Sequence, residues 1–175
     1  LREKDLLQLK KVENVFIRFS VDGWGKADEW IRQDTKWEEK LQVMDQYYKH
    51  FKLRVWDVTA NSLGVRQIPK LVEYLWEHYP EAKVQIRPVV NKTEILMENI
   101  PDRLKAKPLE FFEKHKNKLE GVDHVINEMR KPFNPDPNRA KTVKHWVDYY
   151  DNTGVVKLGD FDPELSDWIQ SNGQQ

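Results

Sequence analysis

The sequence predicts an α/β fold in which three parallel strands are joined by two helices and followed by a mostly helical C-terminal region. Three runs rich in β-branched and aromatic residues occupy residues 15–20, 53–59 and 83–90. Two longer segments with apolar residues at helical spacing separate these runs, and strands joined through helices run parallel. After Asn91 the sequence contains no further strand-like run.

The first strand-like run, residues 15–20, is apolar along most of its length and is interrupted by Arg18. A near-continuous apolar run is typical of a strand covered on both faces, and this run therefore predicts such a strand. The end of a short helix precedes it. Residues 22–35 then predict a loop, which is longer than the roughly two to six residues usual between a strand and a helix.

Two helices connect the three strands. A helix over residues 36–50 is predicted by an apolar stripe that contains Trp37, Leu41, Met44 and Tyr48. A second helix is predicted over residues 66–79, with Pro69 in its first turn, where the missing N–H is not needed. Together with the strands, these helices form two right-handed crossover units.

The second half of the chain predicts mainly helices. It contains an irregular segment over 91–101, helices over 108–119, 122–130 and 139–150, a proline-rich linker over 132–137 and a last helix from residue 161. We therefore predict two regions. Residues 1–91 form the strand-and-helix region, and residues 92–175 form a helical region that packs on the sheet.

Composition excludes several classes of protein. The 175 residues carry 29 basic and 29 acidic side chains, so no overall charge attracts nucleic acid or an anionic membrane. No apolar stretch approaches the roughly 20 residues of a membrane span, and the start lacks a signal-peptide pattern. The absence of cysteine excludes disulfides, thiolate zinc sites and cysteine-ligated iron–sulfur clusters on this chain. We expect a cytoplasmic protein without nucleic-acid or membrane partners.

Four polar residues near the ends of the first two strands are the candidate binding residues, because α/β folds bind ligands at the carboxyl edge of the sheet. Ser20 and Asp22 end the first strand, Arg32 lies in the long loop and Asn61 follows the second strand. Each has a structural alternative. Ser20, Asp22 and Asn61 can form local turns, the last of them in a left-handed conformation. Arg32 can form a surface salt bridge with the nearby acidic residues, which are Asp28, Glu29 and Asp34.

Other clusters of polar residues carry no comparable signal. The 5 histidines lack the spacing of a zinc site. No pairing of a nucleophile with a base is visible, so no catalytic residue is predicted. Asp162, just before Pro163, is expected to cap the last helix rather than to bind a cation.

The motifs and their order resemble those of the radical S-adenosylmethionine (SAM) enzymes, and are most similar to the twitch-domain-containing group known from bacteria and phages. The likeness begins with the strand at 15–19 and its end, Ser20-Val21-Asp22-Gly23. It continues along the chain through Glu29-Trp30-Ile31-Arg32, Trp37, Thr59, Asn61, Ile100-Pro101-Asp102-Arg103-Leu104-Lys105 and Pro163-Glu164-Leu165.

This resemblance implies a partial (β/α) barrel, since three strands are too few to close one. It also implies a cradle for SAM, in which Ser20 and Asp22 hold the ribose, Arg32 holds the methionine carboxylate and Asn61 makes a further polar contact. The CxxxCxxC loop of the family, which binds a [4Fe–4S] cluster, is missing, as are the cysteines of an auxiliary cluster. Gly154 stands where the late DxxR motif of the family has its Arg.

The expected function is therefore that of a C-terminal fragment, or a split or degenerate relative, of a radical SAM enzyme. It would contribute part of the SAM cradle and a cover for an unidentified substrate, and it would be inactive alone. A [4Fe–4S] cluster would come only with a missing N-terminal half. The alternative is a non-catalytic α/β scaffold or interaction subunit, because a partial barrel leaves sheet edges exposed. That missing half or a second copy of the chain would be the partner.

Overall fold

The computed structural model describes residues 3–89, 92 and 95–172. The α/β class predicted from the sequence is confirmed: three strands form one open, parallel sheet with the order β1–β2–β3. The strands are β1 (Phe16–Val21), β2 (Leu53–Ala60) and β3 (Lys83–Pro88). The α-helices are α1 (Glu3–Leu9), α2 (Lys26–Ile31), α3 (Trp37–His50), α4 (Ile68–His78), α5 (Asp102–His115), α6 (Val122–Met129), α7 (Pro137–Thr153) and α8 (Pro163–Asn172).

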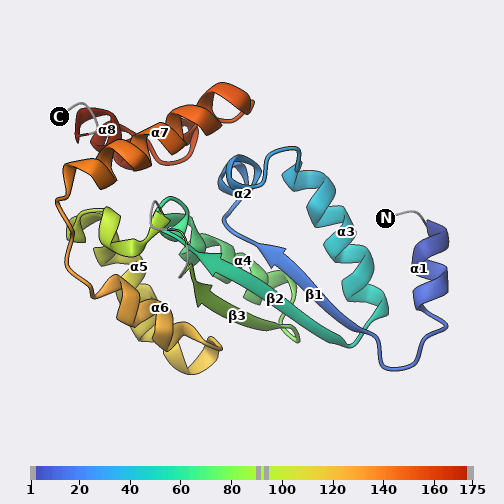
Figure 1. Cartoon of the computed structure of the whole chain (residues 1–175). Coiled ribbons are helices and arrows are strands. Elements are labelled where there is room, and N and C mark those ends of the chain that lie inside the picture. Colours follow the sequence, from blue (N-terminus) through green and yellow to red (C-terminus); the bar gives the residue numbers. More distant parts are fainter. Residues whose placement is uncertain (1–2, 90–91, 93–94, 173–175) are drawn as a thin grey trace.

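One face of the sheet is packed against α3 and α4; in Figure 1 α4 lies behind the strands and α3 lies beside β1. The ring of Phe19 lies 5.6 Å from that of Tyr47 on α3. The ring of Trp56, which is fully buried, lies 4.9 Å from that of Tyr79 at the end of α4. Right-handed crossovers between strands that neighbour each other in chain order place both helices on this one face.

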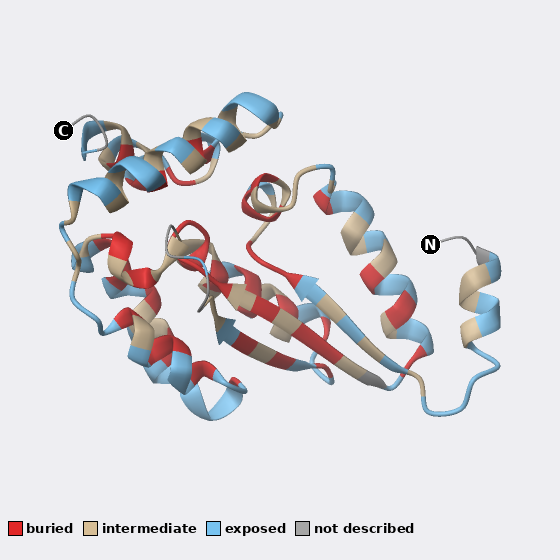
Figure 2. Cartoon of the chain, viewed as in Figure 1, coloured by how far each residue is buried: buried red, intermediate tan, exposed pale blue. Residues whose placement is uncertain are grey.

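The opposite face of the sheet is polar and partly exposed, so the prediction that β1 is covered on both faces is wrong. In β1 exposed and partly buried residues alternate, and Phe16 is 52% exposed. Arg18 and Ser20 share this face with Asp57 of β2, because the register pairs Ser20 with Asp57. Figure 2 shows the contrast between this strand and the largely buried β2. We call this polar surface the open face.

The two edges of the sheet differ. Beyond β3, Glu120 adds a single parallel bridge: Ile86 N donates to its carbonyl at 2.8 Å, and its own N–H donates to Val84 O at 3.0 Å. This contact also positions α6 against β3. Beyond β1, no strand is present among the residues that the structure describes.

Two predicted boundaries are wrong, and both differences involve helices. The segment 22–35 is not a plain loop, because it contains α2. The helix expected from residue 108 begins at Asp102 instead, with Pro108 inside it. A proline within a helix leaves the carbonyl four residues earlier without its N–H donor. Here that carbonyl belongs to Leu104, and Arg66 Nη1 donates to it at 3.3 Å.

The C-terminal helices α7 and α8 lie beyond the arrowheads of the strands (Figure 1). Asp136 caps α7 by accepting from Asn138 N at 2.9 Å, and α7 begins at Pro137, inside the predicted linker. The expected cap of α8 is confirmed, since Leu165 N donates to Asp162 Oδ1 at 3.2 Å. A single hydrophobic core contains residues from both sides of residue 91.

Within the described ranges, none of the helices has both the length and the apolar character needed to span a bilayer. The third strand, predicted over 83–90, ends at Pro88, and Val90 and Asn91 lie outside the described residues.

Replacing Arg66 by Met is expected to lower the free energy of unfolding by about 3 kcal/mol. The substitution removes the partner of the buried Asp162 carboxylate, whose Oδ2 accepts from Arg66 Nε at 2.8 Å. Urea unfolding followed by tryptophan fluorescence measures the loss. Arg103→Ala is the matched control, because Arg103 and its partner Glu164 are both exposed and such pairs contribute less than about 1 kcal/mol. Equal losses in the two variants would contradict this account of the Arg66 pairing.

Candidate functional site

A cavity of about 450 Å³ lies at the carboxyl ends of the strands. This volume falls within the roughly 300–1,000 Å³ that is common for small-molecule sites. Its lining residues are Asp22, Trp30, Ile31, Thr59, Asn61, Leu63, Val89, Lys92, Ile95, Trp146 and Tyr150. A larger hollow of about 660 Å³ lies at the opposite end of the sheet, around the start of β3. The position at the carboxyl ends makes the smaller cavity the candidate site.

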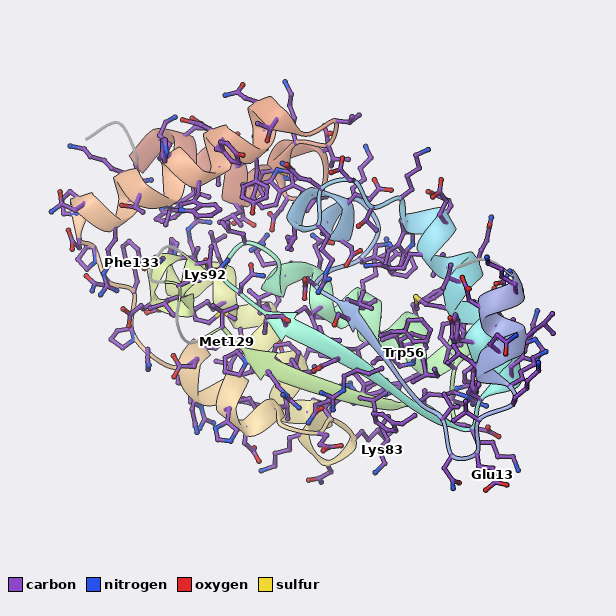
Figure 3. All side chains as sticks on the ribbon, turned by 45° about the vertical axis from the view of Figure 1, so that its right-hand side comes forward. Glu13, Trp56, Lys83, Lys92, Met129 and Phe133 are labelled. Atoms are coloured by element: carbon purple, nitrogen blue, oxygen red, sulfur yellow. The ribbon has the colours of Figure 1, made fainter. Side chains whose placement is uncertain are left out.

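The parallel register brings the ends of all three strands to this cavity. Asp22 directly follows β1, Asn61 directly follows β2 and Val89 directly follows β3. Pairing of Ala60 with Pro88 keeps the ends of β2 and β3 level, and pairing of Val21 with Val58 ends β1 two residues earlier. Figure 3 shows Lys92 beyond the carboxyl end of β3, whereas Lys83 marks its start.

Asp22 and Arg32 form an ion pair at the edge of the cavity. Asp22 Oδ2 accepts from Arg32 Nε at 2.6 Å, so Arg32 does not pair with Asp28, Glu29 or Asp34 as the alternative reading expected. Asp22 is 7% exposed, and its Oδ1 is buried and has no partner in the described part of the chain. Both terminal nitrogens of Arg32 also lack a hydrogen-bond partner among those residues. The pair therefore offers an acceptor and a two-pronged donor to a ligand.

A second, buried ion pair holds the Asp22 loop in place. The Asp22 N–H donates to Asp28 Oδ1 at 2.9 Å, and Asp28 Oδ2 accepts from Lys40 of α3. Burial raises the pKa of the Asp28 carboxyl, and the Lys40 ammonium opposes that shift without cancelling it. Lys40 Nζ also reaches the carbonyl of Ser20 at 3.5 Å. The ends of β1 and α2 are thus fixed to α3 by charged groups that water barely reaches.

Asn61 forms the turn that its residue type predicts. Its Oδ1 accepts from Leu63 N at 3.0 Å and from Gly64 N at 2.9 Å. The expected left-handed conformation is not found, because the only described non-glycine residues with positive φ are Asn14 and Asp34. Asn61 Nδ2 makes no hydrogen bond to the residues that the structure describes, so its donor is open to a ligand.

Gly64 allows the Asn61 turn to approach Asp22. A Cβ at this position would lie 2.9 Å from the Asp22 carbonyl oxygen and 2.8 Å from Ile31 Cδ1, both closer than packed atoms allow. Only glycine permits that contact without a shift of the β1 end. The close approach is what places the two predicted residues, Asp22 and Asn61, around one cavity.

The structure separates Ser20 from the other candidates. Ser20 is exposed on the open face and does not line the cavity. Its neighbours there include Asp57, whose Oδ2 accepts from Arg18 Nη1 at 3.2 Å. Asp22 and Asn61 line the cavity, Arg32 joins them through Asp22, and Ser20 lies outside this group.

Aromatic residues line the side of the cavity that faces the C-terminal helices, and the sequence did not predict this role. Trp30 comes from α2, and Trp146 and Tyr150 come from α7. The rings of Trp30 and Tyr150 lie 5.1 Å apart, and those of Tyr150 and Trp146 lie 5.5 Å apart. Trp146 and Tyr150 lie one turn apart on α7, and periodicity alone does not distinguish a core stripe from a cavity wall.

In the described ranges, no group of three or more histidine, aspartate or glutamate side chains is arranged to hold a metal ion. The cavity instead offers a carboxylate, an amide and aromatic rings, and the Arg32 guanidinium lies beside it through its pair with Asp22. These groups suit an organic ligand with hydroxyl and carboxylate groups.

Replacing Lys40 by Met is expected to lower the free energy of unfolding by about 3 kcal/mol at neutral pH, because the buried Asp28 carboxylate loses its counter-ion. The folded-state pKa of Asp28 already lies above the value of an exposed aspartate, and the substitution raises it further. The loss should therefore shrink as the pH falls and Asp28 becomes protonated. Urea unfolding of both proteins at about pH 7 and about pH 5 measures this difference.

The double variant Asp28→Asn, Lys40→Met controls for the loss of packing around Lys40. It should recover part of the lost stability at neutral pH and show a weaker pH dependence than Lys40→Met alone. A loss that stays constant between the two pH values would contradict the assignment of a buried carboxylate as its cause.

Comparison with protein-family models, with curated proteins and with solved structures finds no match for this chain. No relative therefore assigns a ligand to the cavity. The ligand of the cavity has to be inferred from the residues that line it and from the order of the motifs along the chain.

Proposed function

We propose that this chain supplies part of a SAM-binding cradle and the substrate cover of a radical SAM enzyme. The observation that carries the proposal is that Asp22 and Asn61 line one cavity at the carboxyl ends of parallel strands, and that Arg32 pairs with Asp22 beside it. The ordered motifs that resemble this family contain the same residues. The winding of the sheet, with its helices on one face, is compatible with a partial (β/α) barrel whose inner surface is the open face.

The unpaired groups of the cavity suit the polar parts of SAM. The two terminal nitrogens of Arg32 match a carboxylate in a bidentate geometry. The buried Oδ1 of Asp22 lacks a donor, which a ribose hydroxyl would supply. Asn61 Nδ2 donates to a further oxygen or nitrogen of the cofactor. Ser20 lies on the open face and would contact a ligand that extends from the cavity along the strands.

SAM, when bound, supplies the adenosyl group for hydrogen abstraction from a substrate, and that chemistry needs an iron–sulfur cluster. The chain has no cysteine with which to bind one. Its own residues bind and orient SAM, while the C-terminal helices exclude water from the cavity. The cluster has to be held by cysteines on another polypeptide segment.

The second candidate function is that of a non-catalytic scaffold or interaction subunit. The edge of β1 favours it, since no described strand pairs with it on its outer side and Phe16 is 52% exposed there. An N-terminal half-barrel or a second copy of the chain is the partner that such an edge suits. Binding of SAM separates this candidate from the first.

Isothermal titration of the chain with SAM tests the proposal. Saturable binding is expected for the native sequence, and Arg32→Ala should weaken it by about 10-fold or more, because a charge-assisted hydrogen-bond pair is lost. Arg32→Lys keeps the positive charge but loses the paired guanidinium donors, so it should give an intermediate affinity. Arg103→Ala is the matched control on an exposed arginine that does not line the cavity.

Thermal unfolding of each variant verifies that the fold is retained. Absence of SAM binding by the native chain would contradict the proposed cradle and favour the scaffold. Equal affinities of the native chain and the Arg32→Ala variant would contradict the role of Arg32.

A further inference from the structure

The aromatic side of the cavity is a rigid stack of three rings, which we call the aromatic wall: Trp30, Trp146 and Tyr150. The ring planes of Trp146 and Tyr150 are nearly parallel, at 24°, and Trp30 is tilted by 38° against Tyr150. Trp30 Nε1 donates to Asp151 Oδ1 at 2.7 Å, which fixes the orientation of its ring. The faces of aromatic rings carry negative potential, so this wall attracts cations.

The cavity lining carries one acidic and one basic side chain among the described residues. The carboxylate of Asp22 has one oxygen paired with Arg32 and the other buried without a partner. The remaining basic group of the lining is Lys92, which is exposed, and its Nζ lies 5.9 Å from the centre of the Trp146 ring. The ring of Trp146 therefore lies within cation–π reach of an ammonium, and no such contact is found for Trp30 or Tyr150 among the described residues.

The geometry of SAM fixes where its own positive charge would lie. The sulfonium is bonded to the ribose through a single carbon and to the amino-acid chain that ends in the carboxylate. Asp22 and Arg32, which would hold those two ends, are directly hydrogen-bonded to each other. If Asp22 and Arg32 hold those two ends, the sulfonium between them would face the cavity, one side of which is the aromatic wall.

We propose that the aromatic wall recognises the positive charge of the ligand, and so makes the cavity selective for a sulfonium or an ammonium over a neutral thioether of the same shape. This inference depends on the proposed function, and it assigns the selectivity to Trp146 and Tyr150 of the C-terminal region. The Asp22 carboxylate adds to the attraction, because it lines the same cavity as the aromatic wall.

Three ligands that differ at one position test the inference in titrations. SAM carries a sulfonium, sinefungin carries an ammonium at the same place and S-adenosylhomocysteine carries a neutral sulfur. The native chain should bind the two cations about 10-fold more tightly than the thioether. Equal affinities for all three ligands would overturn the inference and leave the proposed function intact.

Substitution at Trp146 tests whether the wall is the cause. Trp146→Leu should bring the ratio between SAM and S-adenosylhomocysteine close to one, mainly by weakening SAM. Trp146→Phe keeps a ring and should retain most of the preference. Trp146 is chosen because it is partly exposed and makes no side-chain hydrogen bond to the described residues, unlike Trp30. A preference that survives in Trp146→Leu would overturn the inference.

A probe without an adenosyl group separates this inference from the proposed function. Tetramethylammonium chloride is titrated against the intrinsic tryptophan fluorescence, with sodium chloride at equal ionic strength as the control. Tetramethylammonium can bind even if no adenosyl ligand does. A saturable response to it that is lost in Trp146→Leu would support the cation site and contradict the SAM cradle. No response to any of the four ligands overturns both.

Discussion

Crossovers between parallel strands are right-handed, and β1, β2 and β3 lie side by side in their order along the chain, so α3 and α4 have to fall on the same face. This constraint leaves the other face without helices from the strand region. It also gathers the three carboxyl ends at one edge, where the chain places Asp22, Asn61 and Val89. The cavity exists because α2 and α7 then close over that edge and supply its aromatic side.

Ion pairs and hydrogen bonds to charged side chains fix the carboxyl end of β1. The end of β1 is followed by Asp22, whose N–H and carboxylate are each held by a different charged residue, Asp28 and Arg32. Asp28 is fully buried and depends on Lys40 for its counter-ion. Breaking a buried ion pair is costly, so these groups are fixed in position before any ligand arrives. Binding of a ligand to Asp22 and Arg32 therefore costs little conformational entropy of the protein.

The sequence predicted the strands, their parallel order and the two crossover helices, because periodic patterns and proline positions report local structure directly. It did not predict α2, since the preceding residues 22–25 include two glycines typical of a loop, and a helix of 6 residues spans fewer than two turns. It placed the start of α5 at Pro108, because the arginine that satisfies the freed carbonyl is 38 residues away in the chain. The grouping of Asp22 with Asn61 followed from the predicted strand ends. The partner of Arg32 and the wall formed by α7 depend on tertiary contacts that no local pattern encodes.

The bond between Trp30 and Asp151 has a thermodynamic consequence. Asp151 Oδ1 also accepts from Leu158 N at 2.8 Å, so one carboxylate oxygen ties α2 to both ends of the turn between α7 and α8. A ligand that contacts Trp30 and Tyr150 together is bound only while this tie is closed. By linkage, its binding raises the free energy of local opening of α7 and α8. Occupancy of the cavity is thus coupled to the hydrogen-exchange protection of helices whose far ends never touch the ligand.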